Sequence, residues 1–315
     1  MKAAQFGRFG GPDVLRVNEA GRPAPGEGGV LVQVAASSVN GHDVLVRSGG
    51  LKMVSGRKFP LGTGLDFAGI VAEVGPGVNG FRAGDRVWGT VHPRQRHVTA
   101  AAAEYVTVPA DRIAPAPAGI TSAEAASLVV AGTTALIALR DSTHLEGGER
   151  VLVRGAAGGV GTAAVQLAHA IGGHVTALAR DRHAQALRDL GADQVLGYDA
   201  TPEQTGTFDV IIDTPGSDLE CYRRRLTRNG RMVTVGLSAS ALAAIGLSAV
   251  HGSRRIRAFS ANPDTALLND LAGYVASGAL RPVVSSVFPL GGIAAAHQAF
   301  SQGGTLGKHV ITVTA

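Results

Sequence analysis

The chain has a single cysteine, Cys221, among its 315 residues. One thiol cannot form an internal disulfide bond, and one thiolate cannot supply the cysteine clusters that hold structural zinc. A sequence almost free of cysteine also fits a reducing compartment. We therefore expect a cytoplasmic protein that has neither disulfide bonds nor a structural zinc lobe.

Aromatic residues are scarce too, at 4% of the chain, although the net charge is +5 and the pI is about 9.8. Surfaces that bind single-stranded nucleic acid combine basic patches with aromatic side chains on which bases stack. Here the basic residues are scattered, and short clusters such as Arg223–Arg225 and Arg254–Arg255 contain no aromatic residue. We expect no nucleic-acid partner and attribute the charge to a solvated surface and to a phosphate-bearing ligand.

Long apolar segments are lacking as well. No apolar stretch reaches the length of a membrane span without a charge or a break. The first residues, Met1–Phe6, lack the apolar core of a signal peptide and have the pattern of a β-strand. These features predict no membrane-spanning segment and no membrane partner.

Glycine, in contrast, is plentiful, with 44 residues, and its most informative occurrence is the run from Gly155 to Gly161. A β-branched segment, 150–154, precedes this run, and an alanine-rich segment with helical periodicity, 162–171, follows it. A strand, a tight glycine turn and a helix N-terminus together form a site for a dinucleotide pyrophosphate. A plain strand-to-helix turn is the alternative, and the complete strand-and-helix context makes it the less favoured interpretation.

The pattern of elements changes along the chain. Up to about residue 110, short strands such as 30–34 and 67–74 alternate with glycine and proline turns, which indicates an all-β domain. From about residue 121, strands alternate with helices, which predicts a doubly wound parallel sheet and an α/β fold class. In this part we expect strands at 150–154, 175–179, 208–213 and 231–235, and helices at 162–171 and 183–190. A helix at 293–300 and a strand at 309–314 are expected near the C-terminus.

Several further motifs occur in a fixed order along nearly the whole chain. They are Val39–Asp43, Gly64–Val71, Phe81–Val87, the glycine run, Leu190–Asp193 and Gly307–Lys308. In this order they resemble the zinc-free medium-chain dehydrogenase/reductases, in particular the quinone oxidoreductase (zeta-crystallin-like) branch. The resemblance implies a GroES-like β catalytic domain formed by residues 1–120 and 262–315, and a Rossmann NADPH-binding domain at residues 121–261. It also implies an active site in the cleft between the domains, and a homodimer.

The resemblance bears on metal use through two positions. Zinc-dependent relatives carry a cysteine where this chain has Asn40, and a His-Glu pair where it has Leu65–Asp66. His92 and His97 flank a loop-like segment that is a poor scaffold for metal ligands. We expect an enzyme without metal. Hydrogen-bond donors or water must then stabilise the negative charge that hydride transfer places on the acceptor oxygen, which favours a quinone or an α,β-unsaturated carbonyl as substrate.

The end of the second cofactor-domain strand indicates which nicotinamide is used. NAD-specific domains usually carry an acidic residue there, whereas this chain has Ala179 followed by Arg180. Arg180 offers a permanently charged donor fork to a ribose 2′-phosphate, which favours NADPH. In the alternative interpretation, Arg180 and Arg182 lie on a surface loop and Asp181 takes the acidic role.

Further cofactor contacts are implied by the resemblance alone. They are Asn40, Thr133, Gly158, Gly159, Val160, Tyr198, Gly236, Leu237 and Lys308. For three of them a structural role is a close alternative. Thr133 would serve helix packing, Tyr198 would be a packed aromatic at a strand end, and Lys308 would face water.

Candidate catalytic residues are Asn40, His42 and Lys52. The amide of Asn40 is suited to contact nicotinamide or substrate oxygen, His42 to donate a proton, and Lys52 to place a charge near the substrate. A turn residue, a loop histidine and a solvated lysine are the respective alternatives. A tyrosine found in many relatives is replaced by Leu45, so the acceptor stays open between a quinone or enone and an enoyl thioester of polyketide or fatty-acid type. A non-catalytic, crystallin-like NADPH-binding protein is a further alternative.

One segment allows three interpretations. Residues 237–250 are unusually apolar and directly follow a predicted strand. They line the substrate pocket, form a dimer interface, or make an ordinary buried helix.

Overall fold

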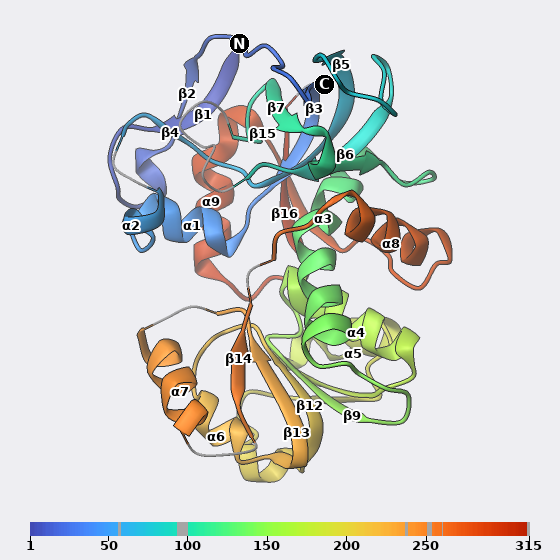
Figure 1. Ribbon diagram of the computed structural model, residues 1–315. Coiled ribbons are helices and arrows are strands. Elements are labelled where there is room, and N and C mark those ends of the chain that lie inside the picture. The colour runs from blue at the N-terminus through green and yellow to red at the C-terminus, as the bar shows by residue number, and fades with distance from the viewer. Residues whose placement is uncertain (56–57, 93–99, 237–238, 251–253, 260, 314–315) are drawn as a thin grey trace. The chain divides into compact units, whose positions relative to one another are not determined.

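The chain forms two compact units (Figure 1). Unit 1 comprises Met1–Val130, Asn262–Ala276 and Pro282–Ala315, and unit 2 comprises Ala131–Ala261 and Ser277–Arg281. The computed structural model describes residues 1–55, 58–92, 100–236, 239–250, 254–259 and 261–313. All statements below concern these residues.

The unit boundaries differ from the sequence-based ones at two places. The sequence places the first boundary after residue 120, whereas the continuous helix α3 (Ser122–Leu136) contains the boundary between the two units. The sequence also assigns 277–281 to the β domain, but these residues belong to unit 2. The side-chain amide of Gln166 holds them there, because it accepts the N–H of Arg281 at 3.0 Å and donates to the carbonyl of Arg281 at 3.1 Å.

Unit 1 is built on two sheets. In the larger sheet the strand order is β15-β16-β3-β5-β6-β8, and β7 also pairs with β3. The strands are β3 (Gly29–Ser38), β5 (Asp66–Val74), β6 (Arg86–Thr90), β7 (Tyr105–Pro109), β8 (Ile113–Pro115), β15 (Val284–Pro289) and β16 (Lys308–Thr312). The smaller sheet is formed by β2 (Arg16–Glu19), β1 (Lys2–Phe6) and β4 (Leu61–Gly62), in that order. The apolar alternation of the first part of the sequence therefore produces the expected β domain.

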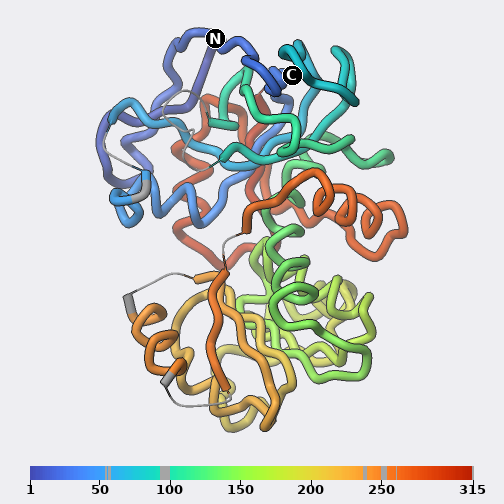
Figure 2. The backbone as a smooth tube through the Cα atoms, in the orientation of Figure 1, coloured from blue at the N-terminus to red at the C-terminus, as the bar shows by residue number. Residues whose placement is uncertain are grey.

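The last part of the chain returns to unit 1, where the red C-terminal segment lies beside the blue β3 (Figure 2). Strand β16 pairs antiparallel with β3, with Val310 opposite Ser38. Helix α9 (Ile293–Gln302) packs against β15 and β16. The expected strand at 309–314 thus begins one residue earlier, at Lys308, and this pairing brings Lys308 to the end of β3.

Unit 2 contains a parallel sheet with the order β11-β10-β9-β12-β13-β14. Its strands are β9 (Arg150–Arg154), β10 (His174–Leu178), β11 (Gln194–Leu196), β12 (Phe208–Asp213), β13 (Leu226–Thr234) and β14 (Ile256–Ala258). Numbered from β9, this is the order 3-2-1-4-5-6 of a doubly wound dinucleotide-binding fold, as the sequence predicts. The connecting helices are α4 (Gly159–Ile171), α5 (Ala184–Asp189), α6 (Leu219–Arg223) and α7 (Ala239–Val250).

Helix α3 bears on the expectation that no segment spans a membrane. Together with the π-helical turn Ile137–Ser142 it forms one helix, Ser122–Ser142, that is long and apolar enough to span a membrane by length and composition. The fold buries 72% of its most apolar part. A helix that is apolar on all sides is typical of a protein core as well as of a membrane.

The solvent exposure of helix α7 excludes one of the three interpretations of the apolar segment 237–250. Leu242 and Leu247 are 61% and 60% exposed, whereas Ala241 and Ser248 are buried. The buried side packs against α6 and β14, and the Ser248 hydroxyl accepts the N–H of Ile256. The segment is therefore not an ordinary buried helix. Residues 237 and 238 lie outside the described part of the chain.

Candidate cofactor and substrate site

The glycine run forms a tight turn between β9 and α4. Gly155 has a φ of +67°, and a Cβ atom there would overlap the Thr214 hydroxyl. A Cβ atom on Gly161 would lie 2.7 Å from the Cα atom of Ala156, so helix and turn approach each other too closely for a side chain. Gly158 is the N-cap of α4.

This turn fits the phosphates of a dinucleotide. The N–H groups in the first turn of an α-helix have no intrahelical acceptor, and the helix dipole adds positive charge at that end. In α4 the first turn contains Gly159 and Val160, which were expected to contact the cofactor, and Gly158 itself is exposed. The geometry of the turn therefore suits the role that the sequence predicts for these three residues.

Two predicted residues follow neighbouring strands at the same edge of the sheet. Leu178 of β10 pairs with Leu196 of β11, and Arg180 and Tyr198 each lie two residues beyond this pair. Arg180 is exposed, and Tyr198 is 54% exposed. Partial burial raises the pKa of the Tyr198 phenol, and the charges of Arg154 and Arg180 oppose that shift. The two arginines and the tyrosine therefore lie within electrostatic range of one another.

Asp181, the acidic residue of the alternative interpretation, directly follows Arg180. One carboxylate oxygen of Asp181 would be 2.8 Å from a Cβ atom on Gly197, which precedes Tyr198. Asp181 thus faces the end of β11, beside the strand that Arg180 follows. Both a cationic and an anionic side chain therefore lie at this edge of the sheet.

Sequence analysis missed a buried ion pair at this edge. Arg154, at the end of β9, donates to the Asp213 carboxylate at 2.6 Å, and both residues are buried. Burial raises the pKa of Asp213, and the charge of Arg154 opposes the shift. The guanidinium also stacks on the ring of Tyr222 at 3.7 Å. A charged residue at the end of an otherwise apolar strand was the available signal.

The ion pair fixes the turn that follows β12 against the glycine turn. Asp213 accepts the N–H of Gly216 at 2.7 Å, and the Thr214 hydroxyl donates to the carbonyl of Arg154 at 3.0 Å. Gly236, which was expected to contact the cofactor, packs against the same turn, since a Cβ atom there would lie 2.5 Å from the nitrogen of Gly216. Leu237, its predicted neighbour in the site, lies outside the described residues.

The burial of Thr133 and of Lys308 bears on the structural alternatives to cofactor binding. Thr133 has no exposed surface, which favours its alternative role in packing helix α3. Lys308 does not face water either, because it is 7% exposed and its ammonium group is enclosed by unit 1. Strand β16 carries Lys308 into the sheet, and this long-range pairing has no local signal in the sequence.

In unit 1, Asn40 lies at the centre of a buried polar network. It follows β3 and is the N-cap of helix α1 (Gly41–Ser48). Its amide nitrogen donates to the Asp66 carboxylate at 3.1 Å, and its amide oxygen accepts from the Lys308 ammonium at 2.6 Å. The network thus joins three strands or strand ends that are far apart in the sequence.

The other two candidate catalytic residues lie on helices α1 and α2. His42 is half-buried in the first turn of α1. Lys52 is exposed at the start of the short helix α2 (Lys52–Ser55). Among the described contacts, none joins Lys52 to Asn40, so a solvated lysine remains the simpler interpretation of its position.

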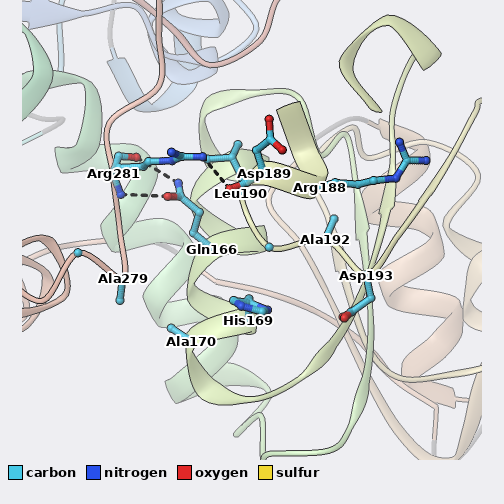
Figure 3. A pocket seen from close by; sticks show the side chains of 12 residues that line it. Gln166, His169, Ala170, Arg188, Asp189, Leu190, Ala192, Asp193, Ala279 and Arg281 are labelled. Carbon is cyan, nitrogen blue, oxygen red and sulfur yellow. Dashed lines mark hydrogen bonds between the residues drawn. The ribbon is translucent and has the colours of Figure 1, made fainter. Parts of the chain in front are cut away.

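A pocket of about 620 Å³ lies elsewhere on unit 2 (Figure 3). Its lining includes Gln166, His169, Asp189 and Arg281, from the C-terminal ends of α4 and α5 and the segment 277–281. Helices that connect parallel strands end at the amino edge of the sheet, opposite the glycine turn. Within the described residues, this pocket contains none of those predicted to bind cofactor or substrate.

Comparison with known proteins gives the family. Residues 26–118 match the alcohol dehydrogenase GroES-like domain, and residues 190–311 match the family described as zinc-binding dehydrogenase. The chain is 30% identical to the mitochondrial NAD(P)H oxidoreductase RTN4IP1 of Danio rerio over 99% of this chain and 91% of that protein. The chain belongs to the medium-chain dehydrogenase/reductase family.

Two further proteins of this family identify the branch. The chloroplast envelope quinone oxidoreductase homolog of Arabidopsis thaliana is 30% identical to this chain, over 92% of this chain and 92% of that protein. The structure of the quinone oxidoreductase from Coxiella burnetii superposes with a TM-score of 0.92 at 31% identity, over 100% of this chain and 99% of that one. The chain therefore lies in the quinone oxidoreductase branch, and it is an oxidoreductase that uses a nicotinamide cofactor.

The family also contains enoyl reductases of similar structure. The CurK enoyl reductase superposes with a TM-score of 0.83 at 25% identity, over 99% of both chains. The fold is thus shared by proteins with different hydride acceptors, and the acceptor has to be argued from the residues of the site.

Proposed function

We propose that the protein is an NADPH-dependent reductase that transfers hydride to a quinone or an α,β-unsaturated carbonyl without a metal ion. The observation that carries the proposal is the edge of the parallel sheet where the glycine turn and Arg180 lie together in unit 2. A turn without side chains suits a pyrophosphate, and an exposed guanidinium suits a 2′-phosphate.

The residues of unit 1 suit the chemistry of such acceptors. Bound reduced nicotinamide supplies the hydride, and the acceptor oxygen gains negative charge that a proton from solvent then neutralises. Lys308 places an ammonium in a buried environment, where the amide oxygen of Asn40 holds it. Hydrogen-bond donors in a water-poor site stabilise a developing oxyanion strongly.

Zinc independence is supported by the side chains that stand at the positions of the zinc ligands. Asn40 is hydrogen-bonded to Asp66 and Lys308, and a buried ammonium beside it repels a cation. Within the described residues, no group of three or more His, Cys, Asp or Glu side chains is placed to hold a metal. Activity that persists after treatment with a chelator supports this part of the proposal, and loss restored by zinc contradicts it.

An enoyl-thioester reductase is the second candidate, favoured by the structural similarity to the CurK enoyl reductase. Oxidation of NADPH by 9,10-phenanthrenequinone, a simple enone and crotonyl-CoA, measured side by side, separates the two functions. We expect the quinone and the enone to turn over faster than crotonyl-CoA. The reverse order favours the thioester reductase, and tight NADPH binding without turnover favours a crystallin-like protein.

We further propose a homodimer located in the cytoplasm. The exposed leucines of α7 support self-association, because exposed apolar patches mark interaction sites. Light scattering coupled to gel filtration tests the dimer, and fractionation of cells tests the location.

A further inference from the structure

The ammonium group of Lys308 has a defined set of partners. It donates to the carbonyl of Val39 at 2.7 Å and to the amide oxygen of Asn40 at 2.6 Å. An ammonium has three N–H donors. Among the described residues, the third N–H of Lys308 has no acceptor.

The orientation of the Asn40 amide is fixed from the other side. Its nitrogen donates to the Asp66 carboxylate at 3.1 Å and to the carbonyl of Ser38 at 3.2 Å. Both amide N–H groups are thus used, and a flipped amide would turn them towards an ammonium, which accepts no hydrogen bond. Asp66 and Lys308 together allow one orientation of Asn40.

Burial and the nearby Asp43 raise the pKa of the Asp66 carboxyl, and the charge of Lys308 and the hydrogen bonds from Ser38 and Asn40 oppose that shift. It has no exposed surface and accepts hydrogen bonds from the Ser38 N–H at 2.9 Å and the Ser38 hydroxyl at 2.8 Å, in addition to Asn40. Donors on every side favour the ionised form of a carboxyl group. A carboxylate, an amide and an ammonium therefore lie in a row inside unit 1.

We infer that Asp66 is a positioning residue that acts through Asn40, fixing its amide and keeping Lys308 as a charged donor at the candidate site. The use of that donor in catalysis rests on the proposed function, whereas the arrangement itself does not. An amide between the two charges keeps them from forming a direct ion pair, so Lys308 retains its third N–H for the oxygen of a ligand.

Other charged groups also face Lys308. Burial lowers the pKa of its ammonium, and the carboxylates of Asp66, on β5, and Asp43, on α1, oppose that shift. Asp43 is already bound to the N–H groups of Asn40 and Gly64 at 3.0 and 3.2 Å. His309, the next residue of β16, is buried, and burial together with Lys308 lowers its pKa, so it remains neutral.

Direct titration of Lys308 tests the inference. The chain has only four lysines, and Lys2, Lys52 and Lys58 are exposed, so the buried Lys308 is readily resolved by NMR in the 13C-lysine-labelled full chain. We expect the pKa of Lys308 to lie below its ordinary value of 10.5 and to fall further, by about one unit or more, in Asp66→Asn, because an anion is removed from a buried site. Asp85→Asn, which removes a carboxylate outside the network, is the control.

The outcomes are distinct. A Lys308 pKa that is unchanged in folded Asp66→Asn overturns the inference. If Asp66→Asn does not fold, urea unfolding of Asp66→Asn/Lys308→Met decides. Recovery of a folded protein shows that the two charges are coupled, and continued failure to fold contradicts coupling.

The NMR result is independent of turnover. A protein that shows the expected pKa shift but does not oxidise NADPH would refute the proposed function and leave the role of Asp66 intact. An active enzyme in which the Lys308 pKa does not change in Asp66→Asn would refute the role of Asp66 and leave the proposed function intact.

Discussion

At the scale of single residues, the proposed function depends on the positions of a few cationic side chains and hydrogen-bond donors. Arg180 and the glycine turn are adjacent in the sequence to recognisable strands, so their roles could be predicted from the sequence. Lys308 and Asn40 are separated by 268 positions, and only the antiparallel pairing of β16 with β3 brings them together. The ion pair of Arg154 and Asp213 likewise depends on the register of two strands.

Replacement of Arg180 by alanine should weaken NADPH binding. A guanidinium that holds a phosphate contributes about 1.5–3 kcal/mol, so the dissociation constant should rise by about 10- to 100-fold. Binding of NADH should change by less than about twofold, because NADH has no 2′-phosphate. Fluorescence titration measures both, and Arg188→Ala, which removes an exposed arginine at the opposite edge of the sheet, is the control. Equal losses for both cofactors would contradict the assignment.

Lys308 should impose an alkaline limit on activity. Burial lowers the pKa of its ammonium below the ordinary value of 10.5, so the charged form is lost as the pH rises through the lowered pKa. We expect kcat for quinone reduction to fall in that alkaline range, and the fall to be absent in Lys308→Arg, which keeps its charge. A pH profile that is the same in both enzymes would remove Lys308 from the mechanism.

At the scale of elements, periodicity predicted β9, β10, β12, β13, α4 and α5 of unit 2, because parallel strands buried on both faces have a simple apolar pattern, but it did not predict the short elements β11, β14 and α6. Strand β9 has the bounds that the sequence predicts. The pattern was less informative for α7, whose exposed and buried faces are both apolar. Solvent exposure in such a helix depends on what packs against it.

The glycine turn should not tolerate a side chain at Gly161. A methyl group there would contact the backbone of Ala156 at about 2.7 Å, so α4 must shift away from β9. We expect Gly161→Ala to unfold at lower temperature and to bind NADPH more than about tenfold more weakly, as is typical of overpacked core positions. Thermal unfolding and titration measure the two effects. Gly246→Ala, where the space is open, should leave NADPH binding unchanged and should not lower the unfolding temperature, because alanine favours a helix more than glycine does.

The exposed face of α7 should promote self-association. Leu242→Gln/Leu247→Gln replaces two leucines that are more than half exposed, so the monomer should remain folded while the dimer dissociates. Light scattering over a range of protein concentrations gives the oligomeric state. A variant with unchanged association would assign these leucines to another role, such as lining the substrate pocket.

At the scale of the whole molecule, the order of motifs was the most informative part of the sequence. It predicted two units, a β unit to which the C-terminal segment returns, and an inserted doubly wound sheet. The segment 277–281 was misassigned, because it is attached to unit 2 by hydrogen bonds of Arg281 with the Gln166 side chain and the carbonyl of Asp189, and composition carries no trace of them. The acceptor was not predictable either, since the fold is common to quinone and enoyl reductases.

We expect the protein to act as an NADPH-dependent reductase of conjugated acceptors. The most direct test is the rate of NADPH oxidation with 9,10-phenanthrenequinone after removal of metal ions by a chelator, compared with the rate with NADH. We expect sustained turnover, with kcat/KM at least about tenfold higher for NADPH than for NADH, because a charged contact with the 2′-phosphate favours NADPH. No turnover with the quinone, or equal kcat/KM for the two cofactors, would contradict it.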